Sequence, residues 1–195
     1  MADSLTALSR PYPWPWHGVF EPGRTALLVF RDGGIAPPDG ETTGRLMSVV
    51  ERAACIGVVI GELPGQAPAP EWPDLRADFR VVRPHYGGFS GTDLDFELRK
   101  REITDLIFVG FPFELGADST MRQANDLGYE CLALTDCCSG LAPGTLTGAI
   151  SSIQMSGGIF GAVAETAAIL ELFAKAGTQR EHTQKESDDD HPDSG

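Results

Sequence analysis

The sequence has little positive charge: it contains 15 Lys and Arg residues but 28 Asp and Glu residues, and its formal net charge at pH 7 is −13. Its longest basic run is Arg99-Lys100-Arg101. Nucleic acids and anionic membrane surfaces are bound through clustered basic residues, so this composition argues against both as partners. No segment approaches the roughly 20 apolar residues of a membrane-spanning helix, so we also expect no membrane span.

Cysteine is scarce as well. The sequence lacks both metal-site spacing and a disulfide framework among its four cysteines, which are Cys55, Cys131, Cys137 and Cys138. We interpret them as reduced thiols of a cytoplasmic protein. The first residues contain no basic region followed by an apolar run, so we expect no signal peptide and a cytoplasmic location.

Short apolar runs alternate with helical patterns along most of the chain. The apolar runs predict strands at residues 25–30, 58–60, 79–82, 106–109 and 130–134. Helices are predicted at residues 42–55, 93–102, 117–127, 146–154 and 164–175. This alternation predicts an α/β fold, a three-layer α/β/α sandwich with a mostly parallel, doubly wound sheet.

The composition divides the chain into three regions: an N-terminal arm at residues 1–23, a folded domain at 24–176 and an acidic, disordered tail at 177–195. In the arm, three aromatic residues alternate with prolines, which predicts an extended segment whose rings pack on the body or on a neighbouring subunit. These residues are Tyr12, Trp14 and Trp16. The arm and the apolar turn at 157–161 together predict an oligomer.

Residues 105–136 have the pattern of a strand followed at once by a helix. The apolar run ends at Gly110, and a helical pattern opens near Gly116. A Cys or Ser at this place would be activated by the helix dipole and by backbone N–H donors. Gly116 has no side chain, so the pattern lacks its nucleophile.

Five segments of the chain are distinctive together and in their order: RPYPWPWHG at 10–18, TALLVF at 25–30, HYGGFSGTDLDFELR at 85–99, VGFPFELGADSTMRQANDLGY at 109–129 and GGIFGAVAET at 157–166. In this order they resemble the isochorismatase-like cysteine hydrolase family, above all its ureidoacrylate amidohydrolase and biuret hydrolase branch. The resemblance covers about residues 10–175 and implies a cis peptide between Phe111 and Pro112.

In that family a Cys thiolate attacks an amide or ureido carbonyl, an Asp takes its proton and a Lys stabilises charge. The resemblance places these three positions on Gly116, Arg31 and Arg83, respectively, so it implies that the whole triad is replaced. Some members also carry metal-binding His and Asp residues in a longer connection. Residues 62–78 are short and contain no His, so we expect no metal, and we expect no other cofactor.

The replaced positions still define a candidate site for ligand binding or repurposed chemistry. Arg31 and Arg83 would bring two guanidiniums to one cleft, which suits a carboxylate, a phosphate or another planar anion. Alternatively, Arg31 pairs with a carboxylate and fills the pocket without a ligand; the candidates are Asp32, Glu114 and Asp118. The full candidate set is Arg31, Asp32, Arg83, His85, Tyr86, Phe89, Phe111, Pro112, Phe113, Glu114 and Gly116.

Three functions remain open. The first is a pseudoenzyme that binds a small anionic metabolite or supports a partner subunit, either a second copy or an intact paralogue. The second is a repurposed enzyme of specialised metabolism that uses arginine, histidine or acidic residues of the old pocket. The third is residual hydrolysis of an amide or ureido C–N bond by water. A thiol relocated to Cys137 or Cys138 is an alternative nucleophile.

Overall fold

The computed structural model describes residues 5–31, 35–53, 55–62 and 72–189. Its strands are β1 (Thr25–Arg31), β2 (Ile56–Glu62), β3 (Phe79–Val82), β4 (Asp105–Phe111), β5 (Glu130–Leu134) and β6 (Ala162–Ala164). Within the described residues they form a six-stranded sheet of parallel strands in the order β3-β2-β1-β4-β5-β6. The direction of this order reverses between β1 and β4, as in other doubly wound folds.

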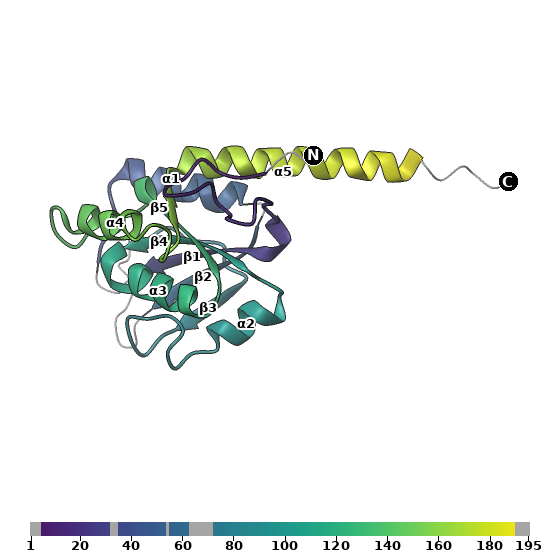
Figure 1. Ribbon diagram of the computed structural model, residues 1–195. Helices are drawn as coiled ribbons and strands as arrows, with labels where there is room; N and C mark the ends of the chain where they lie inside the picture. The colour runs from purple at the N-terminus through teal and green to yellow at the C-terminus, as the bar shows by residue number, and fades with distance from the viewer. Residues whose placement is uncertain (1–4, 32–34, 54, 63–71, 190–195) are drawn as a thin grey trace.

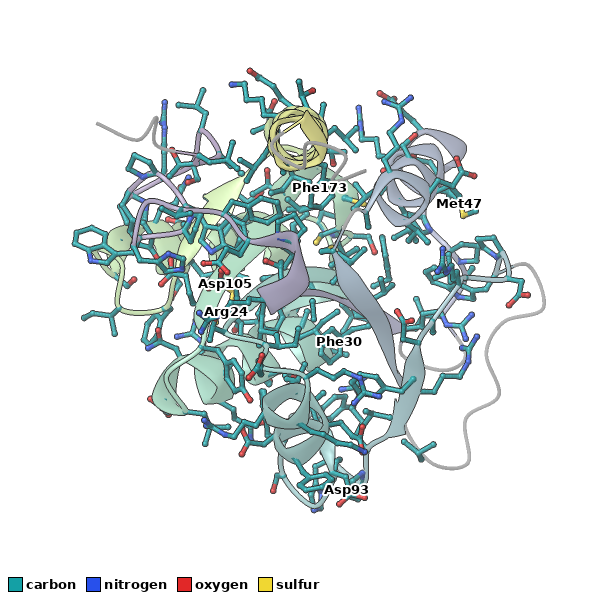
Figure 2. The ribbon with its side chains drawn as sticks, turned by 90° about the vertical axis from the view of Figure 1, so that its right-hand side faces the viewer. Arg24, Phe30, Met47, Asp93, Asp105 and Phe173 are labelled. Carbon is teal, nitrogen blue, oxygen red and sulfur yellow. The ribbon has the colours of Figure 1, made fainter. Side chains whose placement is uncertain are left out.

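Helices cover both faces of the sheet. They are α1 (Gly40–Arg52), α2 (Leu94–Lys100), α3 (Asp118–Asp126), α4 (Thr145–Met155) and α5 (Thr166–Asp189). Figure 1 and Figure 2 show α1 and α5 on one face and α2 and α3 on the other. In Figure 2, Phe173 of α5 lies above the sheet, and Asp93, which precedes α2, lies below it. The predicted three-layer α/β/α sandwich is confirmed.

The central strands β1 and β4 are buried along their whole length. Their sequences are nearly continuous apolar runs because helices cover the sheet on both faces. The register pairs Arg31 with Phe111, so the two strands end side by side. This common end is the point of the sheet where doubly wound folds bind ligands.

The N-terminal arm packs on the body of its own chain. Arg10 and Val163 exchange two backbone hydrogen bonds of 2.9 and 2.8 Å, so the arm pairs with β6 at the edge of the sheet. Trp14 is completely buried, and its ring lies 5.9 Å from that of Phe20. By contrast, Trp16 is 73% exposed. Of the two predicted uses of the arm, the structure shows packing on the body.

The structure corrects two expectations near the C-terminus. Residues 162–164 form β6, which was not predicted because three small side chains carry no apolar run; pairing with β5 defines this strand. Helix α5 continues to Asp189, where a disordered tail was expected from residue 177. Glu, Gln, Lys and Arg have high helix propensity and extend a helix that is already nucleated. Among the described residues, no helix is long and apolar enough to cross a membrane.

Candidate functional site

The predicted strand-to-helix elbow is present at the end of β4. The Phe111–Pro112 peptide bond is cis, as the family resemblance implied. A single π-helical turn, Phe113–Ala117, then leads directly into α3. The N–H of Phe113 donates to the carbonyl of Ser139 at 2.8 Å, which joins this turn to the loop after β5. Phe111, Pro112 and Phe113 are buried, so they shape the turn from within.

Arg83 lies over Gly116, the position that the resemblance assigns to the nucleophile. It follows β3 directly and is fully buried. Its Nη1 donates to the carbonyl of Tyr86, and its Cζ lies 5.2 Å from the ring centroid of Phe30. A Cβ built on Gly116 would lie 2.7 Å from Nη2 and 2.8 Å from Cζ of Arg83, and closer still to Nη1. The guanidinium therefore fills the space that a side chain at position 116 would need.

Arg31 lies in a second, aromatic environment at the end of β1. It is 8% exposed, and its Cζ is 5.7 Å from the ring centroid of Trp72. Trp72 in turn packs on Phe111 at 5.2 Å and donates from Nε1 to the carbonyl of Ile35 at 2.9 Å. The sequence analysis missed Trp72, because it lies in a Pro-rich loop without periodicity. The two arginines thus have different neighbours at the same edge of the sheet.

Two of the three carboxylates that were candidates for neutralising Arg31 have contacts with other residues. Oε1 of Glu114 accepts from the N–H of Leu141 at 2.6 Å. Oδ2 of Asp118 lies 3.2 Å from Nε of Arg122, one turn further along α3. The third candidate, Asp32, lies outside the described residues. The pairing of Arg31 with a carboxylate stays a prediction.

The loop after β3 contributes less to the site than expected. His85 is exposed, and Tyr86 is half exposed while its carbonyl holds Arg83. Phe89 stacks on Tyr129 at 5.7 Å, which places its ring in the packing between this loop and the start of β5. The role of Phe89 as a site residue stays a prediction.

A hydroxyl that the sequence analysis missed connects this loop to the elbow. Oγ1 of Thr120 accepts from the N–H of Gly88 at 2.8 Å and donates to the carbonyl of Gly116 at 2.7 Å. A Cβ on Gly88 would lie 2.9 Å from Cγ2 of Thr120, so glycine permits this close approach. The adjacent glycines of the loop were the signal that another element packs closely here.

The thiols near the elbow are not activated. Burial raises the pKa of Cys137 to about 12 and raises the pKa of Cys138 well above the usual range of a thiol. Sγ of Cys138 accepts from the N–H of Gly110 at 3.4 Å, at the end of β4. Both groups are therefore neutral thiols near pH 7, which argues against a relocated nucleophile. The described part of the chain contains no group of three or more His, Cys, Asp or Glu side chains that could hold a metal ion.

The fold agrees with comparisons to known proteins. A family model described as the isochorismatase domain matches residues 47–168. The chain belongs to the isochorismatase family. It is 40% identical to the uncharacterized isochorismatase family protein YwoC of Bacillus subtilis over 62 residues. These aligned residues are 32% of this chain and 33% of that protein. It is 27% identical over 152 residues to the ureidoacrylate amidohydrolase RutB of Stutzerimonas stutzeri, which covers 74% of this chain and 58% of that protein. The chain thus spans between a third and somewhat more than half of the length of these curated relatives.

Solved structures share the isochorismatase fold. The cysteine hydrolase from Pseudomonas syringae pv. phaseolicola has a TM-score of 0.69 at 18% identity and covers 80% of this chain and 95% of that one. The nicotinamidase from Staphylococcus aureus has a TM-score of 0.58 at 17% identity, and the match covers 72% of this chain and 99% of the nicotinamidase chain. At these identities the likeness shows the fold, and a substrate does not follow from it.

Proposed function

We propose that this chain is a non-hydrolytic member of the isochorismatase family, a pseudoenzyme that acts by binding as a subunit. The observation that carries the proposal is the position of the Arg83 guanidinium directly over Gly116. A cysteine hydrolase needs a thiolate at that point. Here a fixed positive charge without nucleophilic character occupies it.

The other requirements of the reaction are also unmet. Arg31 stands at the position that the resemblance assigns to the base, and a guanidinium stays charged and cannot accept a proton. The nearby thiols of Cys137 and Cys138 are neutral near pH 7. Nucleophile and base are thus lost together, which favours a pseudoenzyme over residual hydrolysis.

Purified protein is expected to show no turnover of ureido, biuret or nicotinamide-type amides. Gly116→Cys alone is expected to remain inactive, because Arg83 occupies the space of the new thiol. The triple variant Arg31→Asp, Arg83→Lys, Gly116→Cys is the matched control, since it restores the residue types of the family triad. Steady-state assays of product release measure the turnover of the wild type and of each variant. Clear wild-type turnover that disappears in Arg83→Ala would contradict the proposal and support a repurposed enzyme.

The contacts of Arg83 support a role in packing. Its guanidinium is held by the Tyr86 carbonyl and the Phe30 ring, both of which are protein groups, and the side chain is fully buried. Such an arginine stabilises the filled site and leaves the protein surface as the place where binding occurs. This favours support of a partner subunit over catalysis in the old pocket.

Binding of a small anion near Arg31 is a second candidate role. Arg31 ends β1 at the reversal of strand order, where doubly wound folds bind ligands. Calorimetric titration with acetate and with inorganic phosphate is expected to show binding that weakens at least about tenfold in Arg31→Ala. Arg52→Ala, at an exposed position of α1, is the matched control. Absence of binding heat in the wild type would remove this second role.

A further inference from the structure

A cavity lies at the end of the sheet opposite to the elbow. Its volume is about 490 Å³, and it is lined by residues at the starts of β4 and β5 and just before β1. The register pairs Asp105 with Thr25 on one side and with Glu130 on the other. Figure 2 shows Asp105 next to Arg24 at this end. Strands β1 and β4 are seven residues long, so the cavity is about 20 Å from the strand end at Arg31.

The cavity is acidic. It is lined by three carboxylates, those of Glu21, Asp105 and Glu130, and by one guanidinium, that of Arg24. The C-terminal end of α3 also borders it, and a helix carries partial negative charge at that end. Asp105 and Glu130 lie directly opposite each other on neighbouring strands, where like charges destabilise a sheet. A positively charged group in the cavity would remove this cost.

Asp105 contributes a buried carboxylate to this cavity. Its side chain is 1% exposed. Oδ1 lies 3.2 Å from Nε2 of His17 in the N-terminal arm, whereas Oδ2 is buried and has no hydrogen-bond partner among the described residues. Burial raises the pKa of Asp105, the contact with His17 lowers it, and the Glu130 carboxylate raises it. A buried polar atom without a partner is costly, so a bound hydrogen-bond donor would stabilise this group.

We propose that this cavity binds the protonated primary amino group of a small organic molecule, with Oδ2 of Asp105 as its buried acceptor. We call it the Asp105 cavity. A primary ammonium has three N–H donors, and three carboxylates line the cavity. A guanidinium fits less well, because its paired donors need both oxygens of one carboxylate, and Oδ1 of Asp105 already contacts His17. The described residues contain no group of three or more metal-binding side chains, which favours an organic cation.

The size and the charge of the Asp105 cavity agree with such a ligand. Cavities of about 300 to 1,000 Å³ bind small molecules in other proteins, so the cavity has room for an aliphatic chain beside the amino group. A protein with a net charge of −13 also attracts cations to its acidic surfaces. The cavity shares no residue with the site of Arg31, Arg83 and Gly116. The inference therefore goes beyond the proposed function, and amide turnover would remove that function without affecting this cavity.

The test is a titration of the nitrogen-15-labelled full-length protein with propylamine hydrochloride near pH 7, followed through the amide chemical shifts. Propylammonium is expected to cause saturable shifts at the residues that line the Asp105 cavity. The same titration with 1-propanol, which has a hydroxyl in place of the ammonium, is expected to cause none, and sodium chloride controls for ionic strength. Absence of saturable shifts at the cavity would overturn the inference, and so would equal shifts with 1-propanol.

Three variants test the assignment of the carboxylates. Asp105→Asn keeps the shape but removes the charge, and it is expected to weaken propylammonium binding at least about tenfold. Glu21→Gln, at an exposed position, is expected to weaken it about two- to fivefold. Glu165→Gln is the matched control, because it removes an exposed carboxylate between β6 and α5, outside the cavity, and its affinity is expected to be unchanged.

Circular dichroism checks that each variant folds. A folded Asp105→Asn protein that binds propylammonium as tightly as the wild type would contradict the inference. If Asp105→Asn does not fold, Glu21→Gln decides, because an unchanged affinity in that variant would contradict the inference equally. An equal loss of affinity in Glu165→Gln would show that the binding reflects the overall charge of the protein, and this too would overturn the assigned cavity.

Discussion

Replacing Arg83 with alanine is expected to lower the free energy of unfolding by about 2 to 4 kcal/mol. The substitution removes the hydrogen bond to the Tyr86 carbonyl and the contact with the Phe30 ring. It also leaves a cavity above Gly116, because the side chain is fully buried. Urea unfolding followed by circular dichroism measures the loss. This expected cost reflects a buried residue that fills the space over Gly116.

Two further substitutions separate volume from charge. Arg83→Met keeps most of the volume and is expected to cost less than Arg83→Ala, because a hydrophobic replacement of similar size removes a buried charge without opening a cavity. Arg52→Ala, at an exposed position of α1, is expected to change stability by no more than about 0.5 kcal/mol. If Arg83→Ala were as harmless as Arg52→Ala, the guanidinium would not be a structural replacement for the nucleophile.

Trp14→Ala is expected to lower the free energy of unfolding by about 3 to 5 kcal/mol, the range of large-to-small substitutions in protein cores. Trp14 is completely buried and packs on Phe20, whose ring lies 5.7 Å from that of Phe173 in α5. The arm therefore belongs to the same core as the sheet and its helices. Denaturant unfolding, again followed by circular dichroism, provides the measurement.

The arm contains its own control two residues away. Trp16 is 73% exposed, so Trp16→Ala is expected to cost no more than about 0.5 kcal/mol. The loss of unfolding free energy for Trp14→Phe is expected to lie between the losses for Trp14→Ala and Trp16→Ala. The reason is that Nε1 of Trp14 is buried without a hydrogen-bond partner among the described residues, and phenylalanine lacks this polar atom. Equal effects of Trp14→Ala and Trp16→Ala would show that the arm is not part of the core.

In our proposal, the fold keeps the form of the family although the family's reaction is lost. The elbow, its cis peptide and the turn into α3 are all present. They are fixed by backbone contacts such as the Phe113 N–H to the Ser139 carbonyl, which do not depend on the side chain at position 116. In our proposal, Arg83 stabilises a filled site that does not catalyse the reaction, and the protein acts through binding at its surface.

Local patterns were sufficient to predict most of the fold. Residues 79–82 and 130–134 were predicted with the bounds that β3 and β5 have, and the predicted end of β1 differs by one residue. β1 and β5 are short apolar runs that are buried along most of their length, so their burial is recorded in the sequence itself, whereas β3 is a half-exposed edge strand. The elbow was also predicted, because an apolar run followed at once by a helical pattern is a local signal.

The sequence by itself determined the succession of strands and helices apart from β6, the parallel sheet, the acidic charge and the residue types at the three positions that the resemblance assigns to the triad. Only the tertiary structure decided that Arg83 lies over Gly116, that Glu114 turns to Leu141 and that Phe89 stacks on Tyr129. The physical reason is the separation of the partners along the chain. Periodicity reports which face of an element is buried, but which side chains meet across a core depends on close packing of distant segments.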